Sequence, residues 1–266
     1  MNDLSDIRSD ICWSDERSVS VLGFDLCNDL IGKVNFADYA FLLLTRRQPT
    51  AAEGRLFSAA LVSLAEHGIT PNVIATRSTY LGAPESLQSA IAAGLLGLGD
   101  RFVGTIEGSA FLISRLSEEL GATPSREQIS TSARREVSNF LASAEPVPGI
   151  GHPIHKPVDP RAERLFEVIA ECGFSPLQGD IMRAVSTEAS DAVGRSLPVN
   201  VTGAIGVCVN VLGIDWRIAR GLGVLARTAG LIGHVMEELL EPMAPRLWHV
   251  TDEAATAHIR PSRQDV

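Results

Sequence analysis

The amino-acid sequence predicts an all-α fold, and two observations carry that prediction. Apolar residues recur at helical spacing in almost every segment of the 266-residue chain. Residues that start and stop helices flank several of these segments. Asn35 precedes an apolar run as a candidate N-cap, Thr50 and Glu53 have the spacing of a capping box, and Gly68 follows as a stop.

Composition narrows the class of protein. The chain is 45% hydrophobic, 5% aromatic and 21% charged, which is typical of a globular protein long enough for one large core or two unequal lobes. A formal net charge of −9 argues against a nucleic-acid-binding surface, so an anionic ligand needs a local cluster of cations. The four cysteines are widely spaced and form no CxxC pair. We interpret them as reduced thiols of a cytoplasmic protein without a zinc site.

Neither end of the sequence suggests targeting to a membrane. Asp3, Asp6 and Asp10 occupy the place where a secretion signal has a basic region followed by an apolar run. The apolar stretches near 197–212 and 222–236 are interrupted by proline, asparagine, arginine and histidine, so we expect core helices and no membrane partner.

The elements divide into two predicted domains. Residues 1–122 and 197–266 form a large helical domain, and the more polar residues 123–196 form a small helical domain that closes over a cleft. A polar arm with a short hairpin is expected over 1–22 and a polar, proline-punctuated tail over 242–266. Helices are predicted over 35–45, 50–67, 70–80, 85–98, 105–120, 126–143, 160–173, 176–188, 204–212, 215–228 and 229–240.

The stretch 147–162 contains a candidate site. Gly149 and Gly151 allow a tight turn and a close approach to a ligand. His152 titrates near neutral pH, and Lys156 and Arg161 suit anions at the start of a helix. The alternative is an ordinary Gly/Pro connection between two helices, and spacing alone leaves both interpretations open.

Several histidines and one arginine can each be interpreted in two ways, as part of a binding site or as structural residues. His152 and His155 have a spacing found in metal sites, but the prolines around them argue against a helix, so no metal site is predicted. Arg227 lies in an apolar helix, where a guanidinium must meet an anion. A ligand carboxylate is favoured over an internal Asp or Glu. His234, seven residues on, lies on the same helix face and is open to a purely structural role.

Five motifs together resemble the citrate synthase superfamily, in the same order and from about Trp13 to Trp248. Gly-Leu-Leu-Gly-Leu-Gly-Asp-Arg-Phe is most similar to the citryl-CoA lyase branch, which includes the C-terminal module of ATP-citrate lyase. The motifs are residues 66–68 (Glu-His-Gly), 94–102 (the stretch just quoted), 147–162 (Val-Pro-Gly-Ile-Gly-His with Lys156 and Asp-Pro-Arg-Ala), 200–203 (Asn-Val-Thr-Gly) and 226–234 (Ala-Arg-Thr-Ala-Gly-Leu-Ile-Gly-His).

The resemblance implies a two-lobed helical fold, an obligate homodimer and no tightly bound cofactor, and it leaves open whether dimers pair further. It implies cleavage of a 3-hydroxy-3-carboxyacyl-CoA (citryl-CoA or an analogue) to an acyl-CoA and a 2-oxoacid, with a coenzyme A thioester and a dicarboxylate as small-molecule partners. His152 falls at the position of the base at the hydroxyl. A substrate-side histidine falls at His67, and carboxylate-binding arginines fall at Arg161, Arg227 and Arg246. Coenzyme A contacts fall at Pro148, Gly149, Ile150, Gly151 and Lys156.

The sequence departs from the family at two catalytic positions. Thr202 stands where the family has an aspartate, and its remaining histidine falls at Phe102 or at Ala75. Glu107, one turn into the next helix, is the candidate for a displaced carboxylate. These departures keep two alternatives open: a catalytically weakened, CoA-ester-binding paralogue or regulatory partner, and a Claisen-type synthase or thioester hydrolase on the same scaffold.

Overall fold

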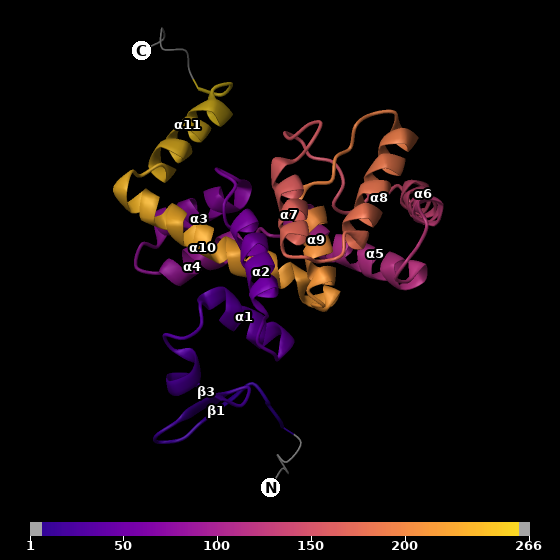
Figure 1. Cartoon of the computed structure of the whole chain (residues 1–266). Helices are drawn as coiled ribbons and strands as arrows, with labels where there is room; N and C mark the ends of the chain where they lie inside the picture. The colour runs from indigo at the N-terminus through magenta and orange to yellow at the C-terminus, as the bar shows by residue number, and fades with distance from the viewer. Residues whose placement is uncertain (1–6, 261–266) are drawn as a thin grey trace.

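The computed structural model describes residues 7–260 and shows an all-α protein with a small N-terminal sheet (Figure 1). Residues 1–6 and 261–266 of the predicted large domain, with the acidic Asp3 and Asp6, lie outside the described residues. The helices are α1 (Phe36–Thr45), α2 (Ala51–Ala65), α3 (Pro71–Gly82), α4 (Leu87–Leu96), α5 (Thr105–Leu120), α6 (Arg126–Ala142), α7 (Pro160–Glu171), α8 (Leu177–Val193), α9 (Val201–Val211), α10 (Ala219–Leu240) and α11 (Ala244–Thr256). Short helical turns are η1 (Leu26–Leu30), η2 (Asp100–Gly104) and η3 (Trp216–Ile218).

The N-terminal sheet confirms the predicted hairpin and adds a third strand. β1 (Cys12–Ser14), β2 (Val19–Val21) and β3 (Phe24–Asp25) pair antiparallel in that order. The Asp15 carboxylate closes the first turn by accepting the backbone N–H groups of Arg17 and Ser18, both at 2.8 Å. Val21, Leu30 and Leu42 form a separate small core that joins the sheet to α1.

Local capping explains where several helices begin. Asn35 accepts the Asp38 N–H at 2.8 Å, and Thr50 and Glu53 form the predicted capping box. These bonds satisfy backbone N–H groups that have no partner inside the helix. The predicted starts of α1 and α2 are therefore confirmed.

Two expectations near the C-terminus are wrong. Residues 219–240 form one helix rather than two, and the Thr228 hydroxyl is accommodated within it by donating to the Val224 carbonyl at 2.8 Å. Residues 244–256 form α11 rather than an irregular tail. Pro245 lies in the first turn of α11, where a missing N–H costs no hydrogen bond.

The core explains why α9 has almost no polar side chains. α9 packs against α5, α7 and α8, and nearly all its residues from Val201 to Val209 are buried. One continuous apolar core reaches from α1 to α10 and includes Ala133, Leu165 and Ile181 of the predicted small domain. α6 packs against α8, on the side of the molecule away from α3 and α4 (Figure 1). The division into two domains stays a prediction.

Within the described residues, no single helix is long and apolar enough to cross a membrane. α4 and the segment Asp100–Leu120 pass the length and composition test only together, and they meet at a bend of 57°.

Candidate active site

A cavity of about 870 Å³ lies where the end of α2, the start of α5, the loop 146–153, the first residues of α7 and α9, and α10 converge. This volume is within the usual range for a site that binds a small molecule. Most of the predicted site residues line it: His67, Pro148, Gly149, Ile150, Gly151, His152, Arg161, Thr202 and Arg227. Segments far apart in the sequence therefore meet at one cavity.

The glycine loop is fixed against the start of α9. The Gly151 N–H donates to the Pro198 carbonyl at 2.7 Å, and the Asn200 N–H donates to the Gly149 carbonyl at 3.0 Å. Gly149 has a φ of +76°, and a Cβ there would lie 2.5 Å from the Gly203 Cα. Only glycine fits both the conformation and the close approach.

The same hydrogen bonds limit the predicted contacts with coenzyme A. The N–H groups of Ile150 and Gly151 already donate to backbone carbonyls, Ile150 to Val147 at 3.3 Å. A ligand in the cavity can touch these residues, but their N–H groups are engaged inside the protein.

Asp159 is a site residue that the sequence analysis treated only as part of a motif. Its side chain is fully buried, caps α7 by accepting the Arg161 N–H at 3.1 Å, and accepts the Val201 N–H at 3.0 Å. It also accepts the Arg161 guanidinium at 2.8 Å. Burial by itself raises the pKa of Asp159, but these hydrogen bonds and the charge of Arg161 outweigh it and lower that pKa. Asp159 thus holds Arg161 at the cavity and ties α7 to α9.

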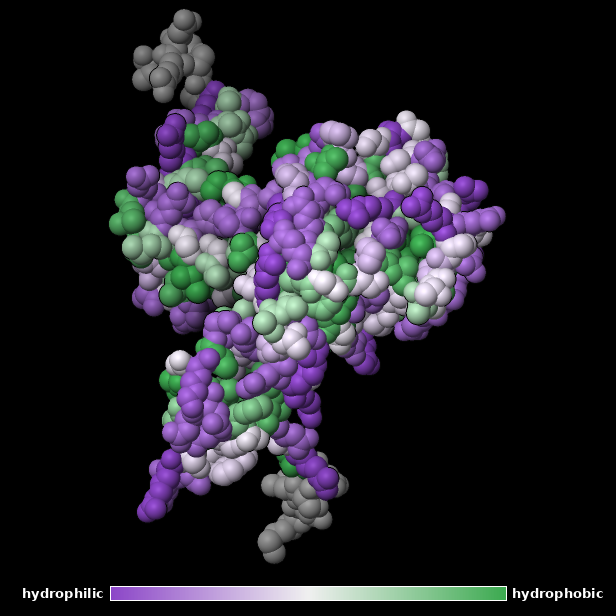
Figure 2. All heavy atoms as spheres, viewed as in Figure 1, coloured by the Kyte–Doolittle hydropathy of each residue, from purple (hydrophilic) through white to green (hydrophobic). Residues whose placement is uncertain are grey.

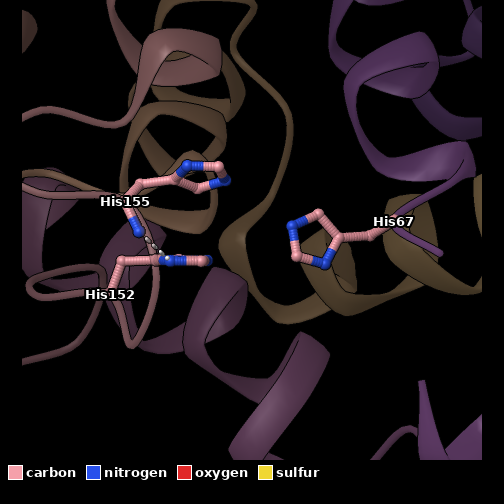
Figure 3. Close-up of side chains that lie close together, drawn as sticks. All are labelled: His67, His152 and His155. Carbon is pink, nitrogen blue, oxygen red and sulfur yellow. Dashed lines mark hydrogen bonds between the residues drawn. The ribbon is translucent and has the colours of Figure 1, made fainter. Parts of the chain in front are cut away.

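Three histidines converge beside Arg161, and Figure 3 shows the His67 ring pointing toward the other two. The His152 and His155 rings stack with centroids 4.5 Å apart, and His67 lies 5.8 Å from His152 and 6.0 Å from His155. No pattern in the sequence indicates that His67 and His155 lie close together, because 88 residues separate them.

Hydrogen bonds define the proton position on His152. Its Nδ1 accepts the backbone N–H groups of Ile154 at 3.1 Å and of His155 at 3.0 Å. Nδ1 therefore holds a lone pair, and the neutral ring carries its proton on Nε2. The Arg161 Nη2 lies 3.4 Å from Nε2, so two donors lie side by side there, and a single acceptor oxygen in the cavity could contact both.

Burial lowers the pKa of both His152 and His67 below the ordinary value of 6.5. Arg161 and the neighbouring imidazoles lower these pKa values further. Both rings are then neutral near neutral pH. In this state His152 is a hydrogen-bond donor toward the cavity, whereas the base predicted from the sequence requires the other tautomer.

The three imidazoles do not fit a metal ion. One nitrogen from each ring lies within 4.8 Å of the other two, which is close enough for all three to bind one metal ion. However, Nδ1 of His152 already accepts two N–H groups, the cluster contains no carboxylate, and the Arg161 guanidinium is adjacent. These neighbours repel a cation and attract an anion.

Arg227 is buried, contacts a carboxylate of the protein on one side and faces the cavity on the other. Its guanidinium donates to the Ala65 carbonyl at 3.1 Å, to Glu66 at 3.3 Å and to the Thr70 hydroxyl at 2.8 Å, and it also lines the cavity. The internal carboxylate weighed in the sequence analysis is therefore present as Glu66, and a ligand carboxylate would be a second partner.

Hydroxyl groups occupy the place of the family's aspartate. The Thr202 hydroxyl donates to Asn200 Oδ1 at 2.6 Å, and the Thr105 hydroxyl lies 3.0 Å from Thr202. Thr202 thus lines the cavity as a neutral, hydrogen-bonded group.

Three predicted residues do not line the cavity. Glu107 is paired with Arg220 at 3.0 Å, so the structure does not bring this carboxylate to the site. Lys156 and Arg246 are exposed, the first in the loop and the second on α11. Sequence proximity was the only basis for Glu107, and side-chain direction on α5 decides against it.

The comparisons with known proteins agree with this geometry. The family described as "Citrate synthase, C-terminal domain" matches residues 23–250. The chain belongs to the citrate synthase family. Citryl-CoA lyase from Hydrogenobacter thermophilus has a similar structure, with a TM-score of 0.78 and 31% sequence identity over 89% of this chain and 88% of that one. The all-α, citrate-synthase-like fold predicted from the sequence is confirmed.

Other relatives in the family are longer than this chain. ATP-citrate synthase subunit 1 of Sordaria macrospora is 28% identical over 245 residues, which cover 85% of this chain and 34% of that protein. Citrate synthase of Deinococcus radiodurans is 29% identical over 203 residues, covering 73% and 50%. The chain thus spans about a third to a half of these relatives. Methanosaeta concilii ATP citrate lyase in complex with (3S)-citryl-CoA shares the fold, with a TM-score of 0.74 at 22% identity over 92% of this chain and 41% of that one.

Proposed function

We propose that this protein is a carbon–carbon lyase of the citryl-CoA lyase type, cleaving a 3-hydroxy-3-carboxyacyl-CoA to an acyl-CoA and a 2-oxoacid. One observation carries the proposal: the cavity places His152 Nε2 beside Arg161, with His67 and Arg227 also lining it. A proton-transfer group next to guanidinium groups suits a substrate whose hydroxyl carbon bears carboxylates. The similarity to a citryl-CoA lyase supports the same reaction class.

The charge of the cavity wall fits an anionic substrate. Arg101, Arg161 and Arg227 line it, and Asp100 is the only carboxylate among the described lining residues. Asp100 is itself paired with Arg220 at 2.8 Å. A polyanionic acyl group and the phosphates of coenzyme A therefore meet mainly positive charge.

The reaction assigns separate tasks to the imidazoles and hydroxyls. In cleavage, the hydroxyl proton leaves to an imidazole lone pair while the carbon–carbon bonding electrons move to the thioester carbonyl, which gives an enolate. His67 is neutral and can accept that proton directly, whereas His152 must first change tautomer. The enolate carbon then takes a proton from water, and the imidazolium returns its proton to the hydroxide left behind. In the reverse direction, Nε2–H of His152 can donate to a ketone oxygen without any rearrangement.

The resting tautomer of His152 therefore favours one alternative, a Claisen-type synthase that joins an acyl-CoA to a 2-oxoacid. Thr202 and the engaged Glu107 favour another, a CoA-ester-binding partner with little turnover, because neither position presents a free carboxylate to the cavity. A homodimer and coenzyme A thioester binding belong to the proposal in every case.

The deciding experiment follows citryl-CoA with the purified protein, measuring release of oxaloacetate and acetyl-CoA. Wild type is expected to cleave it, and His152→Ala is expected to lose about 10²- to 10⁴-fold in turnover, the usual contribution of a general acid or base. His249→Ala, at an exposed histidine on α11, is the control and should keep wild-type turnover.

Each contrary result points to a different function. Binding of citryl-CoA without cleavage would contradict the lyase and support the binding partner, which should then co-purify with a complete homologue. Condensation of acetyl-CoA with oxaloacetate, but no cleavage, would support the synthase. Release of free coenzyme A would support a thioester hydrolase.

A further inference from the structure

A chain of polar contacts runs from Arg227 through the half-exposed Glu66 to buried groups between α3 and α10. Glu66 Oε2, which contacts Arg227 at 3.3 Å, lies 3.0 Å from His234 Nε2. On its other side, His234 Nδ1 lies 3.3 Å from Arg77 Nη2, and Arg77 Nη1 donates to Glu238 at 3.1 Å. Arg77, His234 and Glu238 are all buried, between α3 and α10.

The direction of each contact follows from chemistry. A guanidinium can only donate, so Nδ1 of His234 accepts from Arg77, and the neutral ring carries its proton on Nε2, toward Glu66. That contact is close but poorly aligned, so Nε2 makes no proper hydrogen bond and acts through its partial charge. Arg77 also pairs with Glu237, so two carboxylates face its guanidinium, and Glu237 Oε2 lies 3.5 Å from His234 Nδ1.

Glu66 controls two residues of the cavity. Its second oxygen accepts the backbone N–H groups of His67 at 2.8 Å and Gly68 at 2.6 Å. Burial by itself raises the pKa of Glu66, but the His234 contact, these N–H groups and the charge of Arg227 lower it overall. Glu66 is thus a carboxylate that holds both the Arg227 guanidinium and the backbone of His67.

At its far end the network reaches the start of α11. The Glu238 carboxylate accepts the N–H of Met243 at 3.0 Å and the N–H of Ala244 at 2.8 Å. These bonds satisfy backbone groups at the first turn of α11. One continuous set of contacts therefore joins the cavity to the C-terminal helix.

We propose that His234 is a positioning residue for substrate binding, an inference that rests on the function proposed above. Glu66 Oε2 is shared between Arg227 and His234, so His234 draws part of its charge away from Arg227. Arg227 is then held in place but remains incompletely neutralised, which leaves it able to bind a substrate carboxylate. Without His234, Glu66 would neutralise Arg227 more fully and compete with the ligand.

The test measures citrate and citryl-CoA binding by calorimetry, with turnover in parallel. His234→Ala is expected to weaken citrate binding and raise KM about tenfold while kcat changes less than threefold. His234→Gln, whose side-chain amide can donate toward Glu66, should recover binding to within about threefold of wild type. His249→Gln at an exposed position on α11 is the matched control and should bind as wild type does.

Several outcomes would overturn the proposal. Citrate binding by His234→Ala that is as tight as that of wild type would contradict it. Equal harm from His234→Gln and His234→Ala would also contradict it, because it would indicate a packing role. In an Arg227→Lys background, His234→Ala should have less than a twofold effect, since its influence passes through Arg227; a full tenfold effect there would also contradict the proposal.

A measurement without ligand separates this proposal from the proposed function. If wild type binds neither citrate nor citryl-CoA, the proposed function fails. A double-mutant cycle of Glu66→Gln and His234→Ala on urea unfolding then tests the contact itself. Coupling of about fivefold or more in the unfolding equilibrium constant is expected, and additive effects would refute the link between the two residues.

Discussion

At the scale of single residues, the protonation state of His152 is determined by its own loop. The backbone N–H groups of Ile154 and His155 both donate to Nδ1, so the loop conformation selects the tautomer. Asp159 performs a similar task for Arg161, whose guanidinium it holds at 2.8 Å. The chemistry of the site thus depends on residues that do not line the cavity.

The lowered pKa values of His67 and His152 predict how stability changes with pH. Between the lowered pKa and 6.5, the unfolded chain takes up protons that the folded chain does not. The free energy of unfolding should therefore fall as pH decreases through 6.5. Urea unfolding at a series of pH values from 7.5 to 5.5 measures this dependence, above the range in which most carboxylates titrate.

The matched variant for this experiment is His152→Gln, which removes one of the two groups. Its free energy of unfolding should change less between pH 7.5 and 5.5 than that of wild type. An equal change in both proteins would show that His152 has no lowered pKa.

At the scale of elements, the glycine loop is positioned by α9. The Gly149 and Gly151 carbonyls accept from the backbone and side chain of Asn200, which also caps α9. One asparagine therefore starts a helix and fixes the loop that carries His152. The motifs 147–162 and 200–203 are separate in sequence but form one structural unit.

Gly149→Ala tests this packing against the cost of backbone conformation alone. Gly149 and Gly173 have nearly the same φ, +76° and +77°, but a Cβ at Gly173 would meet nothing within 4 Å. Gly173→Ala should cost about 1–2 kcal/mol for the left-handed conformation. Gly149→Ala should cost about 1–3 kcal/mol more, because its methyl group would overlap α9.

Urea unfolding of both variants and wild type provides the comparison. Equal losses of stability in the two variants would show that the loop can move away from α9 without cost.

At the scale of the whole molecule, apolar side chains remain exposed where α10 meets α11. Leu239, Leu240 and Trp248 are all more than half exposed. Figure 2 shows hydrophobic surface at this corner and over α4. Contiguous exposed apolar surface is typical of an interface with another chain, and it suits the homodimer that the family resemblance implies.

Leu240→Lys tests the predicted dimer, because a charge is costly to bury in an apolar interface. Light scattering after size-exclusion chromatography should give the mass of a dimer for wild type and a larger monomer fraction for the variant. Val62→Lys, at a similarly exposed position on α2, is the control and should remain dimeric. A monomeric wild type would contradict the prediction.

The sequence by itself determined the features that depend on neighbouring residues. Helical spacing and caps such as Asn35 and Thr50 act within one or two turns, so the all-α class and most helix limits could be predicted. Sequence motifs also made it possible to predict that the loop 147–162 and Arg227 belong to the candidate site. The continuity of α10 across Thr228 and the presence of α11 were not predicted. Threonine occurs both within helices and at their ends, and proline occurs both in irregular segments and in the first turn of a helix, so neither residue type decides between the two.

Only the tertiary structure decided which distant groups meet. His67 approaches His152 and His155, Glu107 turns to Arg220, and His234 lies between Glu66 and Arg77. These partners are separated by 85 to 168 residues in the sequence, and their meeting depends on how α2, α3, α5 and α10 pack around one core. Packing, rather than residue type, therefore determines which imidazole can donate a proton and which carboxylate is free.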